Sequence, residues 1–323
     1  MKKRVLSGIQ PSGKLHLGNY FGMIKRMVEY QGQADLFCFI ANLHSLTTIQ
    51  DAEILKKLTL EAAIDLLALG IDPEKSHFWV QSDVPEVTEL AWILSNISSM
   101  GMMERAHSYK DKIAKGIQPS LGLFNYPVLM AADILLIQAD LVPVGKDQKQ
   151  HLEMTRDLAS KFNHHCGETF VIPEPDIQKD LAIIPGTDGQ KMSKSYNNTI
   201  PIFGSEKEIK KAVMSIVTDS KGVEEPKDPE SCNVFALYKH FATAAELKEM
   251  EAGYKKGGMG YGDAKKKLLE KIKIHFTPYQ EKRADLAAHP KKVEAILEAG
   301  AKKVSSISLK TLKKVREKTG LSH

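Results

Sequence analysis

Short apolar runs alternate with helical patterns through the first half of the chain. Near-continuous apolar runs are typical of strands that are buried on both faces of a sheet. Strands that alternate with helices form a parallel sheet, because each crossover returns the chain in the same direction. The expected strands are residues 4–8, 36–41, 78–81 and 142–144, and the expected helices are residues 19–30, 52–69, 86–103 and 147–162. The sequence therefore predicts an α/β fold with a doubly wound parallel sheet, whose site lies at the carboxyl ends of the strands.

The second half of the chain has a different character. Residues 164–205 contain prolines and glycines at short intervals, which is typical of loops and turns. After residue 205 the pattern is helical almost to the end, with interruptions at residues 222–229 and 257–262. We therefore expect two domains, an α/β domain over residues 1–200 and a helical domain over residues 201–323.

The charge is distributed unevenly between these two parts. The net charge is +5 for the whole chain, −3 for residues 1–200 and +8 for residues 201–323. Seven basic residues and one acidic residue lie within residues 302–318. A basic part of this kind indicates a polyanionic partner, although a solvated lysine-rich helix face would give the same pattern.

The cysteines and the apolar segments indicate the compartment. Cys38, Cys166 and Cys232 lie far apart without a Cys-x-x-Cys pair, which argues against a disulfide framework and suits a reducing cytoplasm. The apolar stretch after the basic N-terminus is too short for an export signal, and no run is long enough to span a bilayer. His164-His165-Cys166 lacks a fourth ligand, so we expect a polar turn and no metal site there.

The first glycine-rich loop follows the first expected strand and opens a helix. Residues 8–14 fit most of the P-loop pattern, but Leu15 stands where that motif needs a hydroxyl for magnesium. The dinucleotide pattern G-x-G-x-x-G is absent from this turn. The loop still offers backbone N–H groups at a helix N-terminus, where His16 and Asn19 lie three residues apart. It therefore predicts a phosphate site, with a simple capping loop as the alternative.

A second loop, over residues 189–195, carries two lysines. Lys191 and Lys194 are separated by two residues and flanked by hydroxyl groups. Such a loop can close on a triphosphate and neutralise the charge that develops as pyrophosphate leaves. A surface loop with two solvated lysines is the alternative.

These two loops together resemble a known family. Leu15-His16-Leu17-Gly18-Asn19 resembles the HIGH motif of class I aminoacyl-tRNA synthetases, and residues 191–195 match the KMSKS motif of that class letter for letter. Within the class, the chain is most similar to bacterial-type tryptophanyl-tRNA synthetases. That resemblance extends over nearly the whole chain and is carried by residues 7–13, 126–136 and 142–151.

The resemblance implies an activity and its partners. A protein of this family activates L-tryptophan with ATP and Mg²⁺ to tryptophanyl-adenylate, transfers it to tRNA(Trp), and works as a cytoplasmic homodimer. Residues 1–200 would then be the Rossmann-like catalytic domain that binds ATP and tryptophan, and residues 201–323 the basic tRNA-binding domain. A tyrosyl-tRNA synthetase and a non-catalytic RNA-binding relative remain as alternatives.

One helix face suggests the amino-acid pocket. Tyr126, Met130 and Asp133 are spaced i, i+4 and i+7, so they share a face. A carboxylate in an apolar run is costly unless it is paired, and the indole N–H of tryptophan is a suitable donor. The resemblance implies the same role for Asp133. Phenylalanine would leave this carboxylate unpaired, which predicts rejection by roughly 10⁴ or more without an editing domain.

The resemblance also assigns the remaining site residues. Gln148, together with Gln10, would contact the tryptophan. His16, Asn19, Lys112, Lys191 and Lys194 would be catalytic. The ATP-binding residues would be Gln10, Pro11, Ser12, Gly18, Asn19, Gly145, Lys146, Asp147, Ile183, Lys191, Met192, Ser193, Lys194 and Ser195. The chain departs from the family pattern at Leu6, Lys146 and Tyr196.

Overall fold

The chain forms two compact units. The computed structural model describes residues 2–106, 120–145, 148–177 and 184–322. The first unit comprises Met1–Gly13, Met27–Lys179 and Leu286–His323, and the second comprises Lys14–Arg26 and Asp180–Asp285. This division differs from the expected boundary at residue 200. Residues 14–26 belong with the later helical part, and the C-terminal residues belong with the sheet.

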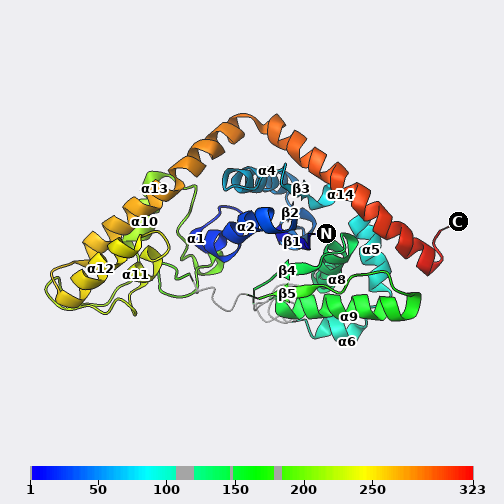
Figure 1. The fold of residues 1–323 in the computed structure, drawn as a ribbon, viewed down its shortest axis with the longest axis horizontal. Helices are drawn as coiled ribbons and strands as arrows, with labels where there is room; N and C mark the ends of the chain where they lie inside the picture. The colour runs from blue at the N-terminus through cyan, green and yellow to red at the C-terminus, as the bar shows by residue number, and fades with distance from the viewer. Residues whose placement is uncertain (1, 107–119, 146–147, 178–183, 323) are drawn as a thin grey trace. The chain divides into compact units, whose positions relative to one another are not determined.

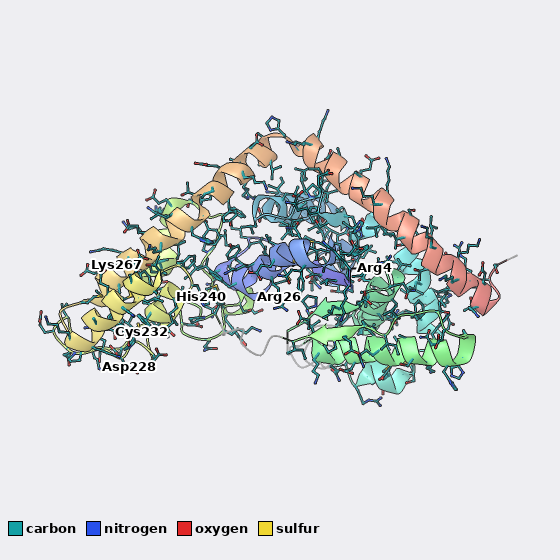
Figure 2. The ribbon with its side chains drawn as sticks, viewed as in Figure 1. Arg4, Arg26, Asp228, Cys232, His240 and Lys267 are labelled. Atoms are coloured by element: carbon teal, nitrogen blue, oxygen red, sulfur yellow. The ribbon has the colours of Figure 1, made fainter. Side chains whose placement is uncertain are left out.

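The first unit is built on a five-stranded parallel sheet in the order β3-β2-β1-β4-β5 (Figure 1). Its strands are β1 (Arg4–Ile9), β2 (Asp35–Ile40), β3 (Ser76–Val80), β4 (Leu141–Pro143) and β5 (Glu174–Asp176). The strand order reverses its direction between β1 and β4, which is the point where doubly wound sheets bind ligands. Arg4, labelled in Figure 2, donates from Nη1 to the carbonyl oxygen of Ile137 at 2.8 Å. The predicted α/β fold with a parallel sheet is confirmed.

Strand β5 was not predicted, because its segment was expected to consist of loops and turns. It is only three residues long and contains Pro175. Proline cannot donate to a strand ladder and is tolerated at a sheet edge, where β5 lies. A strand this short with a proline gives no alternating pattern, so only its partner β4 identifies it.

The helices of the first unit follow the predicted order with three corrections. They are α3 (Asn42–Ser45), α4 (Ala52–Ala68), α5 (Glu86–Ser95), α6 (Met100–Glu104), α8 (Leu121–Leu136), α9 (Lys149–Cys166) and α14 (Pro290–Thr319). The expected single helix over residues 86–103 is wrong, because α5 ends at Ser95 and the Ser99 side chain accepts from Met102 N to begin α6. Helix α9 extends to Cys166, so His164 and His165 lie in its last turn and not in a polar turn. The short helix α3 was not predicted.

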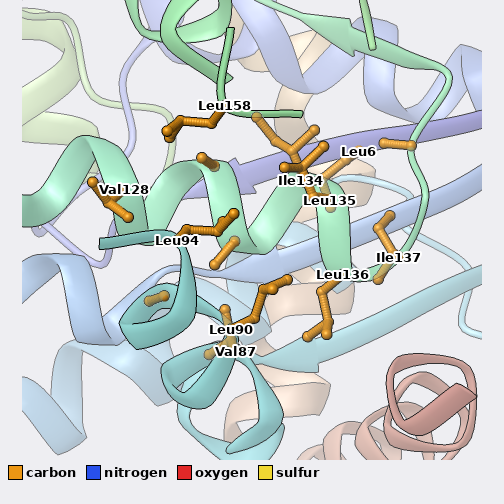
Figure 3. Packing of buried hydrophobic residues seen from close by; sticks show 14 of the residues in the cluster. Leu6, Val87, Leu90, Leu94, Val128, Ile134, Leu135, Leu136, Ile137 and Leu158 are labelled. Atoms are coloured by element: carbon orange, nitrogen blue, oxygen red, sulfur yellow. The ribbon is translucent and has the colours of Figure 1, made fainter. Parts of the chain in front are cut away.

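The core of this unit lies around α8. Leu90 and Leu94 of α5 lie against α8, whose Val128 and Leu135 are fully buried (Figure 3). Leu6 of β1 belongs to the same cluster. Burying side chains of this size contributes about 1.5–3 kcal/mol each to stability.

None of the helices in the described parts of the chain combines the length and the apolar composition that crossing a bilayer requires.

The second unit is mostly helical. It begins with α1 (Leu17–Asn19) and a π-helix (Tyr20–Ile24), and the chain continues into α2 (Lys25–Gln33), which belongs to the first unit from Met27 onward. A 3₁₀ turn (Lys194–Tyr196) precedes α10 (Glu206–Met214), α11 (Asn233–Tyr238), α12 (Ala244–Lys256) and α13 (Tyr261–Ala288). Cys232, labelled in Figure 2, is buried with its Sγ 3.6 Å from the Tyr254 hydroxyl. The predicted helical character after residue 205 is confirmed.

Helix α14 packs closely on β3 of the first unit. Its buried positions recur every three or four residues, as expected for an amphipathic helix. Gly300 is one of them, and a Cβ built there would lie 1.8 Å from the Phe78 carbonyl oxygen. The helix can approach the strand this closely only because position 300 has no side chain.

We therefore expect Gly300→Ala to lower the free energy of unfolding by about 1–3 kcal/mol or more, because backbone atoms must move apart. Urea unfolding measures the change. Gly32→Ala is the matched control, since Gly32 lies in α2 with open space around its Cβ position. That control should gain about 0.5–1 kcal/mol. Equal stability of Gly300→Ala and the natural chain would contradict the close packing.

Candidate active site

The turn that carries His16 is held by backbone pairing within the second unit. Leu17 N donates to the Ile200 carbonyl oxygen and Ile202 N donates to the Leu15 carbonyl oxygen, both at 3.0 Å. His16 itself forms an antiparallel bridge with Pro201. The segment that follows the lysine loop is therefore paired directly with the His16 turn.

The lysine loop also contacts this turn. Gly18 N donates a hydrogen bond to Met192 Sδ at 3.3 Å. A Cβ on Gly18 would lie 3.0 Å from the His16 ring and 3.3 Å from Met192 Cβ, so only glycine fits without displacement. The two motifs, which are about 175 residues apart in the sequence, therefore contact each other in the structure.

His16 is a neutral side chain at pH 7. It is only 5% exposed, and among the described residues its Nδ1 atom has no hydrogen-bond partner. Burial, and secondarily the charge of Lys194, lower its pKa to about 4. A neutral imidazole can donate one hydrogen bond to a phosphate oxygen, while the positive charge near it comes from the lysine.

Asn19 orders the turn from the other side. Its Oδ1 accepts from His16 N at 3.1 Å. This bond leaves the Nδ2 group as the donor that Asn19 can offer to a ligand. The predicted contact of Asn19 with phosphate therefore depends on its amide nitrogen.

The lysines of the loop face outward. Lys191 and Lys194 are exposed, and Met192 between them is buried. Met192 N donates to the Ile184 carbonyl oxygen at 2.9 Å, and Ser193 Oγ accepts from Ser195 N at 3.3 Å. The buried methionine fixes the loop while the cationic groups stay accessible to a ligand.

Asp133 lies in a buried polar cluster in the first unit. It is 8% exposed and accepts from His44 Nε2 at 2.9 Å and from Gln81 Nε2 at 2.8 and 2.9 Å. The Gln81 Oε1 atom accepts from Leu43 N at 3.1 Å, which fixes the direction of its amide. Both donors come from segments that directly follow β2 and β3, at the carboxyl edge of the sheet.

These contacts change the argument for discrimination. Without an indole N–H, the Asp133 carboxylate was expected to have no hydrogen-bond donor. Because His44 and Gln81 already donate to it, phenylalanine would leave the carboxylate hydrogen-bonded, and this residue alone contributes less than the factor of roughly 10⁴ expected above. A carboxylate has about four acceptor positions, so room for an indole N–H remains.

The other pocket residues lie on the same helix, as predicted. Tyr126, Met130 and Asp133 all belong to α8, and Tyr126 and Met130 are half-buried. The Tyr126 hydroxyl is 2.6 Å from Nε2 of the buried His151, and its ring packs edge-on to His44 with the centroids 6.2 Å apart. Polar groups that are hydrogen-bonded to one another therefore lie beside the residues predicted to bind tryptophan.

The remaining predicted residues lie at strand ends of the first unit or outside the described residues. Gln10, Pro11 and Ser12 directly follow β1, with Gln10 and Ser12 exposed and Pro11 buried. Gly145 follows β4, and the exposed Gln148 immediately precedes α9. Lys112, Lys146, Asp147 and Ile183 lie outside the described residues. The roles of all these residues in binding stay predictions.

Sequence reasoning missed four residues that organise these sites. His44, Gln81 and His151 contact predicted pocket residues, and Asn198 is bonded to the lysine loop. His44 and Gln81 could have been found from their position after predicted parallel strands, where functional side chains gather. No local pattern identifies His151 or Asn198, because each is defined by a partner distant in space or by a turn.

Acid should destabilise the protein through His16. Between its lowered folded pKa of about 4 and its ordinary value of 6.5, the unfolded state binds a proton that the folded state does not, so stability falls as the pH drops through this range. His16→Gln should lose less stability than the natural chain between pH 6.5 and 4 in urea unfolding. The other histidines are present in both proteins and cancel in the comparison. The same loss in both would contradict the assignment.

Comparisons with known proteins identify the family. The family described as tRNA synthetases class I (W and Y) matches residues 1–277. A Campylobacter jejuni (strain RM1221) protein named tryptophan–tRNA ligase is 54% identical over 98% of this chain and 100% of its own length. A protein of the same name from Fusobacterium nucleatum is 54% identical over 99% of this chain and 98% of its own length.

Solved structures agree with these matches. Tryptophanyl-tRNA synthetase from Campylobacter jejuni, complexed with ADP and tryptophan, has a TM-score of 0.94 at 54% identity and covers 98% of this chain and 99% of its own. The Mycoplasma pneumoniae tryptophanyl-tRNA synthetase has a TM-score of 0.84 at 32% identity and covers 100% of this chain and 99% of its own. The predicted family and fold class are confirmed. This chain belongs to the class I tRNA synthetases of the tryptophan and tyrosine group.

Proposed function

We propose that this chain is a tryptophan–tRNA ligase, which activates L-tryptophan with ATP and transfers it to tRNA(Trp). The observation that carries the proposal is the contact between the His16 turn and the lysine loop at Gly18 and Met192. It gathers a buried neutral imidazole and two exposed lysines within one unit. Full-length relatives named tryptophan–tRNA ligase support the choice of amino acid.

The first step needs little more than positioning and charge. The carboxylate of tryptophan is ionised at pH 7 and attacks the α-phosphate of ATP without a general base. His16 and Asn19 would donate hydrogen bonds to phosphate oxygens, and Lys191 and Lys194 would stabilise the charge that develops on pyrophosphate. The tRNA ribose hydroxyl then attacks the adenylate, and AMP leaves. Lys112 is proposed to contribute a further positive charge.

The polar cluster around Asp133 would select the amino acid. The indole N–H would donate to a remaining acceptor position of Asp133, while Tyr126 and Met130 pack on the ring. Because His44 and Gln81 fix the direction of the carboxylate, the donor must arrive at a defined angle. We also propose that Gln148 and Gln10 contact the polar end of the substrate.

The donors around the lysine loop suit an anion and not a free cation. Lys191 and Lys194 are cationic, and the carboxylate of Asp188 is bonded to Asn198 Nδ2 and Gln190 N. No group of three or more potential metal ligands occurs within the described residues. We therefore propose that Mg²⁺ arrives coordinated to the ATP phosphates, as part of the substrate.

The basic surface for tRNA is proposed to include α14 as well as the helical part. Lys303, Lys310, Lys313 and Lys314 are exposed on α14, whereas Arg316 is bonded to Glu89 and contributes to packing. Exposed lysines on one helix can neutralise successive phosphates, which makes binding sensitive to salt. We therefore propose that tRNA binds to residues 201–323. Within this range, α14 belongs to the unit that contains the sheet.

We further propose a cytoplasmic homodimer. Three large apolar side chains are exposed on adjoining helices, namely Trp92 (71%) on α5, Met100 (64%) on α6 and Leu121 (85%) on α8. Apolar groups exposed to this extent on packed helices favour contact with another protein surface. Sedimentation of the purified chain at its monomer mass would contradict the dimer.

ATP–pyrophosphate exchange with each of the twenty amino acids tests the function. We expect exchange with tryptophan and none above background with tyrosine or phenylalanine. Exchange with tyrosine alone would transfer the assignment to a tyrosine–tRNA ligase. No exchange with any amino acid would favour a non-catalytic RNA-binding protein.

Lys194→Ala tests the role of the lysine loop. The variant should lower kcat of exchange about a hundredfold or more, because a charge that stabilises the transition state is lost. Tryptophan affinity, measured by calorimetry, should change far less. Lys207→Ala, an exposed lysine of α10, is the matched control and should stay within about twofold of the natural chain. An equal loss of kcat and affinity would indicate ground-state binding instead.

A further inference from the structure

Asn198 is a buried polar side chain at the base of the lysine loop. It is 1% exposed, although its neighbour Asn197 is exposed. Its Oδ1 accepts from Ser193 N at 2.8 Å, and its Nδ2 donates to Asp188 Oδ1 at 2.7 Å and to the Lys191 carbonyl oxygen at 3.1 Å. Both amide protons are used, so the side chain is fully bonded as a donor.

Chemistry fixes the orientation of this amide. The two groups that face Nδ2 are a carboxylate and a carbonyl, which can only accept hydrogen bonds, whereas Ser193 N can only donate. Turning the amide over would place oxygen against oxygen twice and nitrogen against nitrogen once. Asn198 therefore holds Asp188, Lys191 and Ser193 in one arrangement, and no other polar side chain of similar size offers the same donors and acceptor.

The backbone packs closely around the Asn198 side chain. Thr187 N donates to the Asn198 carbonyl oxygen at 2.9 Å. A Cβ on Gly186 would lie 2.3 Å from Asn198 Cγ, and Gly189 has a φ of +84° that favours glycine. The turn over residues 186–189 is thus wrapped tightly around the Asn198 side chain and carries Asp188 to it.

We propose that Asn198 is a positioning residue for the adenylation step, acting through the backbone of Lys191 and Ser193. Its hydrogen bonds connect these residues to Asp188. The side chains of Lys191 and Lys194 would then extend from the loop in a fixed arrangement toward a common anion. This inference rests on the proposed function. A loop that is ordered before the phosphates bind can stabilise the transition state without losing conformational entropy during the reaction.

Asn198→Asp is the sharpest variant. The aspartate has the same shape and still accepts from Ser193 N, but it cannot donate to Asp188 or to the Lys191 carbonyl, and it faces a like charge. Asn197→Asp is the matched control, because it adds the same charge one residue away at an exposed position. The double variant Asp188→Asn with Asn198→Asp restores a donor opposite an acceptor and removes the repulsion, but it loses the bond that Gln190 N makes to the same Asp188 oxygen, so its recovery should be partial.

Steady-state exchange kinetics with tryptophan provide the first measurement. Asn198→Asp should lower kcat at least about tenfold, since hydrogen bonds to a charged group are lost. The KM for tryptophan should stay within about twofold, as should both constants of Asn197→Asp. The double variant should recover at least about threefold of the lost kcat. Similar kcat values for the two single variants, or no recovery in the double variant, would overturn the proposal.

Hydrogen exchange of the Ser193 amide provides a readout that does not depend on activity. In the natural chain this N–H is bonded to Asn198 and should exchange at least about tenfold more slowly than in Asn198→Ala. An unchanged rate of hydrogen exchange would overturn the proposal. If the natural chain itself shows no amino-acid-dependent ATP–pyrophosphate exchange, only the proposed function is refuted. If Asn198→Asp fails to fold, Asp188→Ala removes the hydrogen bond between Asn198 and Asp188 by deleting its acceptor. It should lower kcat with little change in the KM for tryptophan, and equal changes in both would overturn the inference.

Discussion

The backbone pairing of residues 15–17 with residues 200–202 is the contact on which the proposed chemistry depends. Ile200 and Ile202 are fully buried, so apolar burial stabilises this pairing in addition to its hydrogen bonds. It fixes the His16 turn against the segment that leaves the lysine loop. Met192 then reaches Gly18 and the lysines are left outside, which gives a neutral donor and two cations in one place.

Asp133 and Asn198 are buried polar side chains that are hydrogen-bonded to other groups of the protein before any ligand arrives. Asp133 is bonded to His44 and Gln81, and Asn198 is bonded to Asp188 and to the backbone of the lysine loop. Leaving such groups without partners would cost about 1–3 kcal/mol each, so each cluster has one arrangement that is clearly preferred. The orientation of the proposed binding groups is therefore set by the fold. This is the physical basis for proposing that recognition and catalysis rely on preorganised groups.

The fold was largely predictable, and the errors have physical causes. The apolar strands and long helices were found because burial imposes a period on the sequence. Strand β5 was missed because three residues with a proline carry no period. The break between α5 and α6 was missed because serine and asparagine side chains near residues 95–99 bond to the backbone locally, as when Asn96 Nδ2 donates to the Trp92 carbonyl oxygen. The membership of α14 in the sheet unit depends on Gly300, whose importance appears only beside Phe78.

The sequence by itself determined the parallel α/β architecture, the two motifs and the shared face of Tyr126, Met130 and Asp133, since these follow from composition and periodicity along the chain. Tertiary structure alone decided which partners the polar groups have. His44 and Gln81 reach Asp133 because parallel strands end at one edge of the sheet, and Asn198 reaches Asp188 because a tight turn closes around it. Hydrogen-bond partners depend on distances in space, and the order of residues along the chain does not record those distances.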